Sequence, residues 1–222
     1  LDIHHIISDG ISQKILKREF QALNSGEELP PLSIQYKDYA EWLQSPLVRE
    51  LMQKHETYWL EQFSGDIPVL RLPTDFRRPL IQSFEGSVIH RQIDETLSRR
   101  LKELAVRQEV TLFMMLLGIF KILLSKLSGQ EEIIVGSPVA GRGHADLENI
   151  SGFFVNTLAL KSRVTGSMTF EAFLRELKQT TLEAFENQDY PFEELVEKSG
   201  VQRDAGRNPI FDVVFSLAEG DD

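Results

Sequence analysis

The chain has 222 residues and a formal net charge of −10, with 41% hydrophobic and 26% charged residues. This composition is globular and allows one large domain or two small ones. The acidic balance argues against a nucleic-acid partner, because such partners are bound by clustered lysine and arginine. The absence of cysteine excludes a disulfide framework and a cysteine nucleophile, and it fits a cytoplasmic protein. The most apolar run, 112–124, is shorter than the roughly 20 residues that cross a bilayer, so we expect no membrane partner.

The chain opens with the cluster His4-His5-Ile6-Ile7-Ser8-Asp9-Gly10. Histidine can accept or position a proton near neutral pH, which makes this cluster a candidate catalytic loop. A structural alternative is that Asp9 or Ser8 only caps the helix that follows. A metal site is another alternative, although adjacent histidines point apart and no third ligand is nearby. Because a catalytic loop needs folded chain on both sides, we expect the chain to begin inside a larger protein.

Hydrophobic spacing predicts a mainly helical first part. A helix over 11–23 follows the cluster directly, and further helices are expected over 36–42 and 47–63. Three prolines within 67–83 predict an extended crossing between two lobes. The alternating pattern of 86–93 then predicts a strand.

The second part mixes helices and strands. Its expected helices cover 97–104, 111–127, 170–185 and a turn beginning at Pro191, and its expected strands cover 133–135, 153–160 and 210–215. The helix over 111–127 is so apolar that we expect it to be buried nearly all round, with Gly129 as its C-terminal cap. This mixture predicts a layered α/β or α+β fold, a mixed sheet with flanking helices.

Four further clusters follow the histidines in order. They are Tyr36-x-Asp38-Tyr39-Ala40-x-Trp42, Gly152-Phe153-Phe154-Val155-Asn156-Thr157, Gln188-Asp189-Tyr190-Pro191-Phe192-Glu193 and Arg203-Asp204-x-x-Arg207-Asn208-Pro209. Each alone is compatible with an ordinary helix, strand or loop. Together they resemble the core motifs of the condensation domains of nonribosomal peptide synthetases, over nearly the whole chain. The departures, at Asn187, Ser151 and Gly206, remove no group expected to do chemistry.

The resemblance implies a fold like that of chloramphenicol acetyltransferase, with two lobes and the histidine loop at their junction. Residues 1–25 would be the catalytic histidine loop and the following helix, 26–83 a helical region and inter-lobe connector, and 84–222 the C-terminal lobe. The N-terminal lobe of the same domain would be missing, so we expect the isolated fragment to be inactive.

The resemblance also implies an acyltransferase that forms an amide bond between an acyl or peptidyl thioester donor and an aminoacyl thioester acceptor. Both substrates would arrive on phosphopantetheine arms of carrier proteins, beside an adenylation domain, with no cofactor or metal of the domain's own. Related possibilities are an epimerization or ester-forming homologue, or a noncatalytic platform that recruits carrier proteins.

The resemblance places four residues in the catalytic cluster. His5 would face the amine as a base or as a positioning group, and the backbone N–H of Gly10 could approach the reacting carbonyl closely. His4 would be structural, and Asp9 would hold the loop by pairing with an arginine.

Two residues outside the cluster would support it. Arg142 is the expected partner of Asp9, and Asn156 is expected to orient groups along the tunnel between the lobes.

Overall fold

The computed structural model describes residues 2–202 and 204–218. Its helices and strands are, in chain order, the 3-10 turn η1 (His5–Ile7), α1 (Gly10–Asn24), α2 (Tyr36–Leu43), α3 (Pro46–Gln62), α4 (Glu95–Arg107), α5 (Leu112–Ser128), β1 (Glu132–Val139), the 3-10 turn η2 (Ala145–Leu147), β2 (Asn156–Arg163), α6 (Phe170–Glu186) and α7 (Phe192–Lys198). Every helix predicted from the sequence is present. Arg203, the first residue of the last motif, lies outside the described residues.

The sheet is built from two long strands and one short addition. β1 pairs antiparallel with β2, with Val135 opposite Leu160. On the free edge of β1, the Gly136 N–H donates to the Val213 carbonyl and the Gly136 carbonyl accepts from the Phe215 N–H, each at 2.9 Å. This contact is parallel, so the sheet is mixed, as predicted. The strand predicted over 210–215 is reduced to this one bridge.

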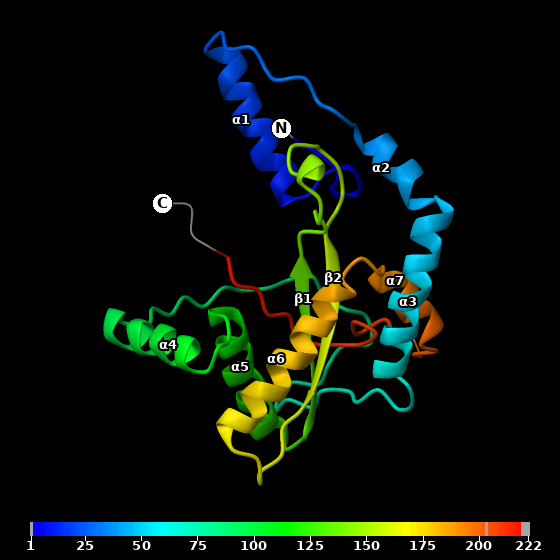
Figure 1. Cartoon of the computed structure of the whole chain (residues 1–222). Coiled ribbons are helices and arrows are strands. Elements are labelled where there is room, and N and C mark those ends of the chain that lie inside the picture. The colour runs from blue at the N-terminus through cyan, green and yellow to red at the C-terminus, as the bar shows by residue number, and fades with distance from the viewer. Residues whose placement is uncertain (1, 203, 219–222) are drawn as a thin grey trace.

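Helices cover the sheet and enclose the main core (Figure 1). α5 and α6 pack side by side, α5 against β1 and α6 against β2, while α7 packs against β2 and carries α3 on its outside. The core is formed by apolar side chains of the helices and both strands, among them Met115 of α5, Val135 of β1, Leu158 of β2 and Leu177 of α6. Their burial supplies the main stabilisation of the fold.

A lysine side chain lies inside this core. Lys121 of α5 is 0% exposed, and its Nζ donates to the Leu160 carbonyl and to the Ser162 hydroxyl, both at 2.7 Å. Burial lowers the pKa of Lys121 to about 7, because the protonated amine loses its water without gaining a carboxylate.

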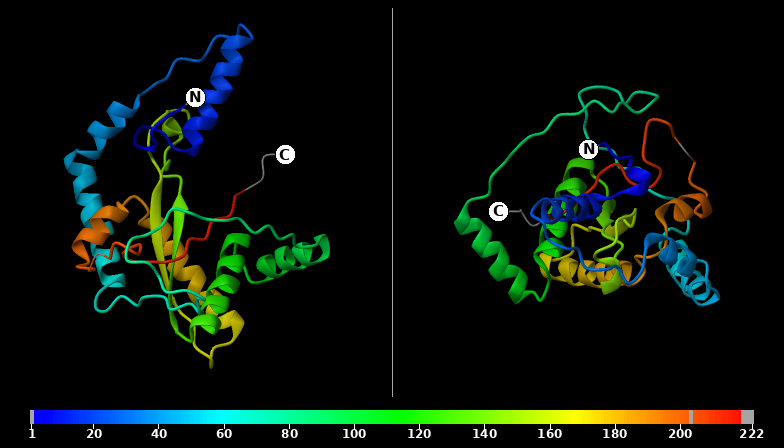
Figure 2. Two further views of the ribbon diagram at one scale, coloured as in Figure 1. Left: turned by 180° about the vertical axis from the view of Figure 1, so that it is seen from behind. Right: turned by 90° about the horizontal axis from the view of Figure 1, so that it is seen from above.

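A second, smaller cluster supports the histidine loop. Leu147, Ile150 and Phe154 are buried together, with Ile34 and Tyr39 packed against them. The first three lie in the loops beyond β1 and before β2, at the end of the sheet where α1 begins (Figure 1). α1 then projects away from the body of the molecule, and the chain returns through α2 and α3 along one side (Figure 2).

Two predictions were wrong. Residues 86–93 form no strand, and every residue in this stretch is exposed. The segment runs around the outside of the molecule (Figure 2), where it has no neighbouring strand to complete its hydrogen bonds. The helix α5 is also not buried all round, because Ile119, Leu123 and Leu127 are 41% to 51% exposed along one side.

Within the described residues, no single helix has the length and hydropathy to cross a membrane. The helices α4 and α5 would reach that length only as a pair, and they are bent by 104° relative to each other.

Candidate functional site

Asp9 fixes the histidine loop to the start of α1. It is the N-cap of this helix, with its Oδ1 accepting from the Ser12 N–H at 2.8 Å. Its Oδ2 accepts from the Phe154 N–H at 3.2 Å, across 145 positions of sequence. The side chain is 0% exposed. The capping role was the structural alternative considered from the sequence, and it is present together with the long-range contact.

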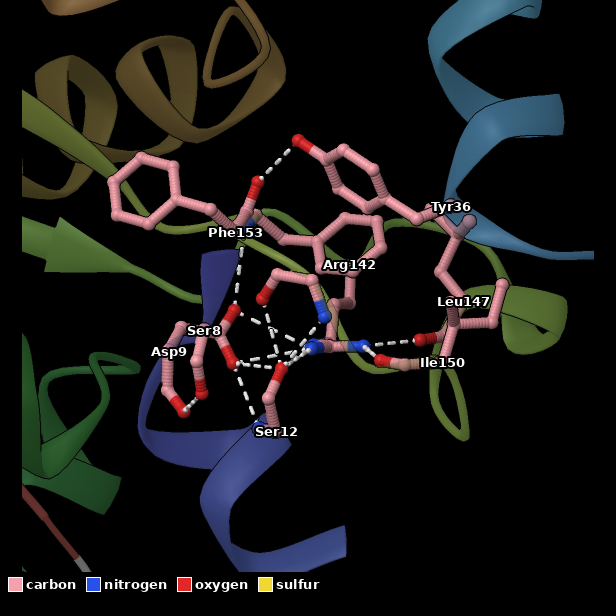
Figure 3. Close-up of polar contacts among 10 residues, drawn as sticks. Ser8, Asp9, Ser12, Tyr36, Arg142, Leu147, Ile150 and Phe153 are labelled. Carbon is pink, nitrogen blue, oxygen red and sulfur yellow. Dashed lines mark hydrogen bonds and ion pairs between the residues drawn. The ribbon is translucent and has the colours of Figure 1, made fainter. Parts of the chain in front are cut away.

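Ser12 joins the helix to the segment before β2. Its hydroxyl lies 2.8 Å from Asp9 Oδ1 and 2.8 Å from the Gly152 carbonyl oxygen, either of which can take its single proton. The same oxygen accepts from the Gly152 N–H and from Arg142 Nη2, each at 3.0 Å. Ser12 therefore links three parts of the chain through one buried atom (Figure 3).

Arg142 is the cation of this cluster. Its Nη2 lies 3.1 Å from Asp9 Oδ1, and its Nη1 donates to the carbonyls of Leu147 and Ile150. The guanidinium lies between the Asp9 carboxylate and these two carbonyls (Figure 3), with its carbon 4.1 Å from the centre of the Phe154 ring. The partner that the sequence analysis expected for Asp9 is thus in contact with it.

The hydrogen bonds around Asp9 keep it ionised. Burial by itself raises the pKa of Asp9, but donation by the backbone and hydroxyl of Ser12, the backbone of Phe154 and the Arg142 side chain outweighs burial and lowers the pKa below the ordinary value of 3.8. Asp9 is therefore a buried anion at neutral pH. Neither of its carboxylate oxygens is exposed to solvent, because the side chain is fully buried.

The two histidines point away from this buried cluster. The His4 Nδ1 accepts from the Ile6 N–H at 3.1 Å and so caps the turn η1. The His5 side chain is exposed, and the centres of the His5 and Phe153 rings lie 5.4 Å apart in an edge-to-face arrangement, with an angle of 78° between the ring planes. Gly10 begins α1, and apart from its chain neighbours and the backbone of its own helix, no described atom lies within 4 Å of where its Cβ would be. The imidazole of His5 is open to an incoming molecule, with Gly10 five positions further along the chain.

The Asn156 side chain contacts the backbone at the start of α7. Its Nδ2 donates to the carbonyls of Gln188 and Tyr190 at 2.7 Å, and its Oδ1 accepts from the N–H groups of Thr157 and Phe192. The amide thus uses both of its protons and both of its lone pairs on backbone. The side chain ties the start of α7 to β2, and its expected role along a tunnel stays a prediction.

Sequence reasoning missed three residues that help to hold the histidine loop. They are Ser12, Tyr36, whose hydroxyl donates to the Phe153 carbonyl at 2.9 Å, and Phe154, whose ring covers Arg142. Ser12 carried a local signal, since a serine three positions after an N-cap aspartate can reach it. Tyr36 and Phe154 were inside recognised motifs, but the bond from the Tyr36 hydroxyl to Phe153 and the bond from the Phe154 N–H to Asp9 each cross more than 100 positions of sequence. Within the described residues, no group of three or more His, Cys, Asp or Glu side chains is placed to hold a metal ion.

Comparison with known proteins agrees with the arrangement of these motifs. The family model described as Condensation domain matches residues 1–221. Tyrocidine synthase 3 of Brevibacillus parabrevis is 55% identical over 217 residues, which are 98% of this chain and 3% of that protein. Gramicidin S synthase 2 of Aneurinibacillus migulanus is 54% identical over 222 residues, which are 100% of this chain and 5% of that protein. The chain thus spans a small part of the relatives that it matches.

Solved structures share the fold. A four-domain nonribosomal peptide synthetase bound to AMP and glycine superposes with a TM-score of 0.86 at 28% identity, over 96% of this chain and 16% of that one. The X-domain from teicoplanin biosynthesis superposes with a TM-score of 0.85 at 24% identity, over 96% of this chain and 50% of that one. The second likeness concerns the fold alone.

Proposed function

The chain belongs to the condensation domain family, and on this premise we propose that it supplies the histidine loop and C-terminal half of a domain that forms amide bonds in nonribosomal peptide synthesis. The donor is an acyl or peptidyl thioester, and the acceptor is an aminoacyl thioester. Each is carried on the phosphopantetheine arm of a carrier protein. The division proposed from the sequence, into 1–25, 26–83 and 84–222, places the reacting loop in the first of these parts.

The reaction needs one proton removed and one oxyanion stabilised. The acceptor ammonium loses a proton, its nitrogen attacks the donor carbonyl, and the tetrahedral intermediate expels the donor thiolate, which takes up a proton. His5 faces the amine, either as the group that accepts the proton or as the group that aligns the nitrogen. The backbone N–H of Gly10 is the nearby donor proposed for the developing oxyanion. His4, which caps the turn, holds the backbone beside His5.

The observation that carries this proposal is the contrast between Asp9 and His5, which are four positions apart. The Asp9 carboxylate is fully buried and bound to Ser12, Arg142 and Phe154, whereas the His5 ring is exposed. A reactive side chain is presented accurately when the residues that support it are locked by packing and hydrogen bonds. Here the buried Asp9 carboxylate anchors the loop, and the His5 imidazole on the same loop is exposed.

The exposed surface at His5 supports the proposal that a second lobe of the domain covers it. Amide formation from a thioester competes with hydrolysis, so the reacting groups need a place from which water is excluded. The His5 side of this chain is exposed, and the chain matches half the length of the X-domain. We therefore propose that the other lobe covers His5 and that this chain alone is inactive.

The test is single-turnover amide formation by the full synthetase, with donor and acceptor loaded on their carrier proteins. His5→Ala is expected to slow product formation by about 100-fold or more, in line with the loss of a positioned acid–base group. His90→Ala, which removes an exposed histidine from the unpaired segment 86–93, is the matched control and should react at the wild-type rate.

Mass spectrometry of the product separates the competing activities. An amide of donor and acceptor supports the proposal, whereas an ester, an inverted stereocentre or carrier binding without any product contradicts it. Wild-type turnover by His5→Ala would also refute the proposed role of this histidine.

A further inference from the structure

We infer that Ser12 is a positioning residue for His5, acting through Phe153. This inference rests on the proposed function. The Ser12 hydroxyl locks the start of α1 to the backbone of Gly152, and the next residue, Phe153, sets the orientation of the imidazole.

The first step is the connection made by the hydroxyl. One oxygen lies within 3.0 Å of both the N–H and the carbonyl oxygen of Gly152, and also of Asp9 and Arg142. Ser12 is 0% exposed, so water cannot replace these bonds if the hydroxyl is removed. The Ser12→Ala change would release the Gly152 backbone from α1 while leaving the Asp9–Arg142 pair in place.

The second step is the fixing of Phe153. Its backbone is held from both sides, because the Gly152 N–H donates to Ser12 and the Phe154 N–H donates to Asp9. Its own carbonyl accepts from the Tyr36 hydroxyl at 2.9 Å. Gly152 also lacks room for a side chain, since a Cβ there would lie 2.1 Å from the Tyr36 ring. These contacts fix the backbone of Phe153, and with it the position of the Phe153 Cβ.

The third step is the dependence of His5 on that position. Within the described residues, the His5 imidazole makes no hydrogen bond, and its ring contact is with Phe153, at 5.4 Å and 78°. An edge-to-face pair of this kind favours one relative orientation of the two rings. The ring that meets the substrate is therefore oriented by a neighbour whose backbone depends on Ser12. A displacement of about 1 Å in such a group can cost about 100-fold in rate.

The experiment is a double-mutant cycle in the full synthetase, read by single-turnover amide formation with carrier-bound substrates. The proteins are the wild type, His5→Ala, Ser12→Ala and the double variant, with Ser137→Ala as the control for loss of a buried serine hydroxyl outside the site. We expect Ser12→Ala to slow product formation by about 10- to 100-fold, with the acceptor concentration that gives half of the maximal single-turnover rate changed less than about threefold. In the His5→Ala background, the same change should slow the reaction less than about twofold, because the group that it positions is gone.

The outcomes separate this inference from the function on which it rests. Ser12→Ala at the wild-type rate, or an equal loss with and without His5, would overturn the positioning role. A wild-type rate in His5→Ala, or no amide from the wild type, would instead refute the proposed function.

Phe153→Ala keeps the inference testable if Ser12→Ala does not fold. It removes the ring that contacts His5 from a 39% exposed position and leaves the buried hydrogen bonds intact. We expect a rate loss of at least about tenfold that vanishes in the His5→Ala background. A Phe153→Ala protein that reacts like the wild type would exclude the proposed path, whatever Ser12→Ala does.

Discussion

Replacing Lys121 with methionine should stabilise the protein near neutral pH and remove part of the pH dependence of its stability. In the folded state the Lys121 amine is enclosed by α5 and β2 and has a pKa of about 7, against an ordinary value of 10.5. The unfolded chain exposes the same amine to water. Protonation at this position therefore favours the unfolded chain.

The sign and the size follow from that difference. Between pH 7 and 10.5 the unfolded chain binds a proton that the folded chain does not, so the free energy of unfolding rises with pH across this window. The slope is at most about 1.4 kcal/mol per pH unit, and the full penalty below pH 7 is about 5 kcal/mol. Methionine has no proton to bind, but it gives up two hydrogen bonds, each contributing about 1 kcal/mol. The net gain expected for Lys121→Met at pH 7 is about 2 to 3 kcal/mol.

The assay is urea unfolding of the wild type and the variant at pH 7 and at pH 9.5. The wild type should gain about 3 kcal/mol more than Lys121→Met over this interval. Lys126→Met, which removes an exposed lysine from the same helix, is the control and should keep the wild-type slope. Equal slopes in the wild type and Lys121→Met would refute the reasoning, since they would mean that the buried amine keeps its proton.

Three further predictions concern the loops that hold the site. Gly141→Ala should destabilise the protein by at least about 2 kcal/mol, because Gly141 has φ +64° and a Cβ there would lie 1.8 Å from the Phe154 carbonyl oxygen. Gly143→Ala is the control, since the space around Gly143 is open, and it should change the free energy of unfolding by less than about 0.5 kcal/mol in the same urea assay. Asn156→Ala should leave backbone groups of residues 188–192 without hydrogen-bond partners and lower the free energy of unfolding by about 2 to 4 kcal/mol. Hydrogen exchange at the start of α7 should become faster, and unchanged exchange there would contradict the proposed link between α7 and β2. Asp9→Asn should lower the free energy of unfolding by about 3 kcal/mol, because it leaves the Arg142 charge without a carboxylate partner. An unaltered stability in urea together with a large loss in the rate of amide formation would show instead that Asp9 acts in the chemistry.

Local patterns predicted the helices because their signals act within a few positions. Asp9 reaches the Ser12 N–H three residues later, and Gly129 ends α5 with φ +71°, as its position after the apolar run predicted. The strand predicted over 86–93 failed because alternation describes a chain that could pair, whereas pairing needs a neighbour that no local pattern contains.

The sequence by itself determined the helices, the order of the motifs and the family to which they belong, because each depends on residues that are close along the chain. Only the tertiary structure decided that Ser12 contacts Gly152, that Asn156 binds the backbone at the start of α7, and that His5 is exposed while Asp9 is buried. The first two of these contacts join segments that are more than 30 positions apart. They exist only after the core has brought the ends of β1, β2 and α1 together, since hydrogen bonds of this strength cannot offset the entropy of closing such loops on their own.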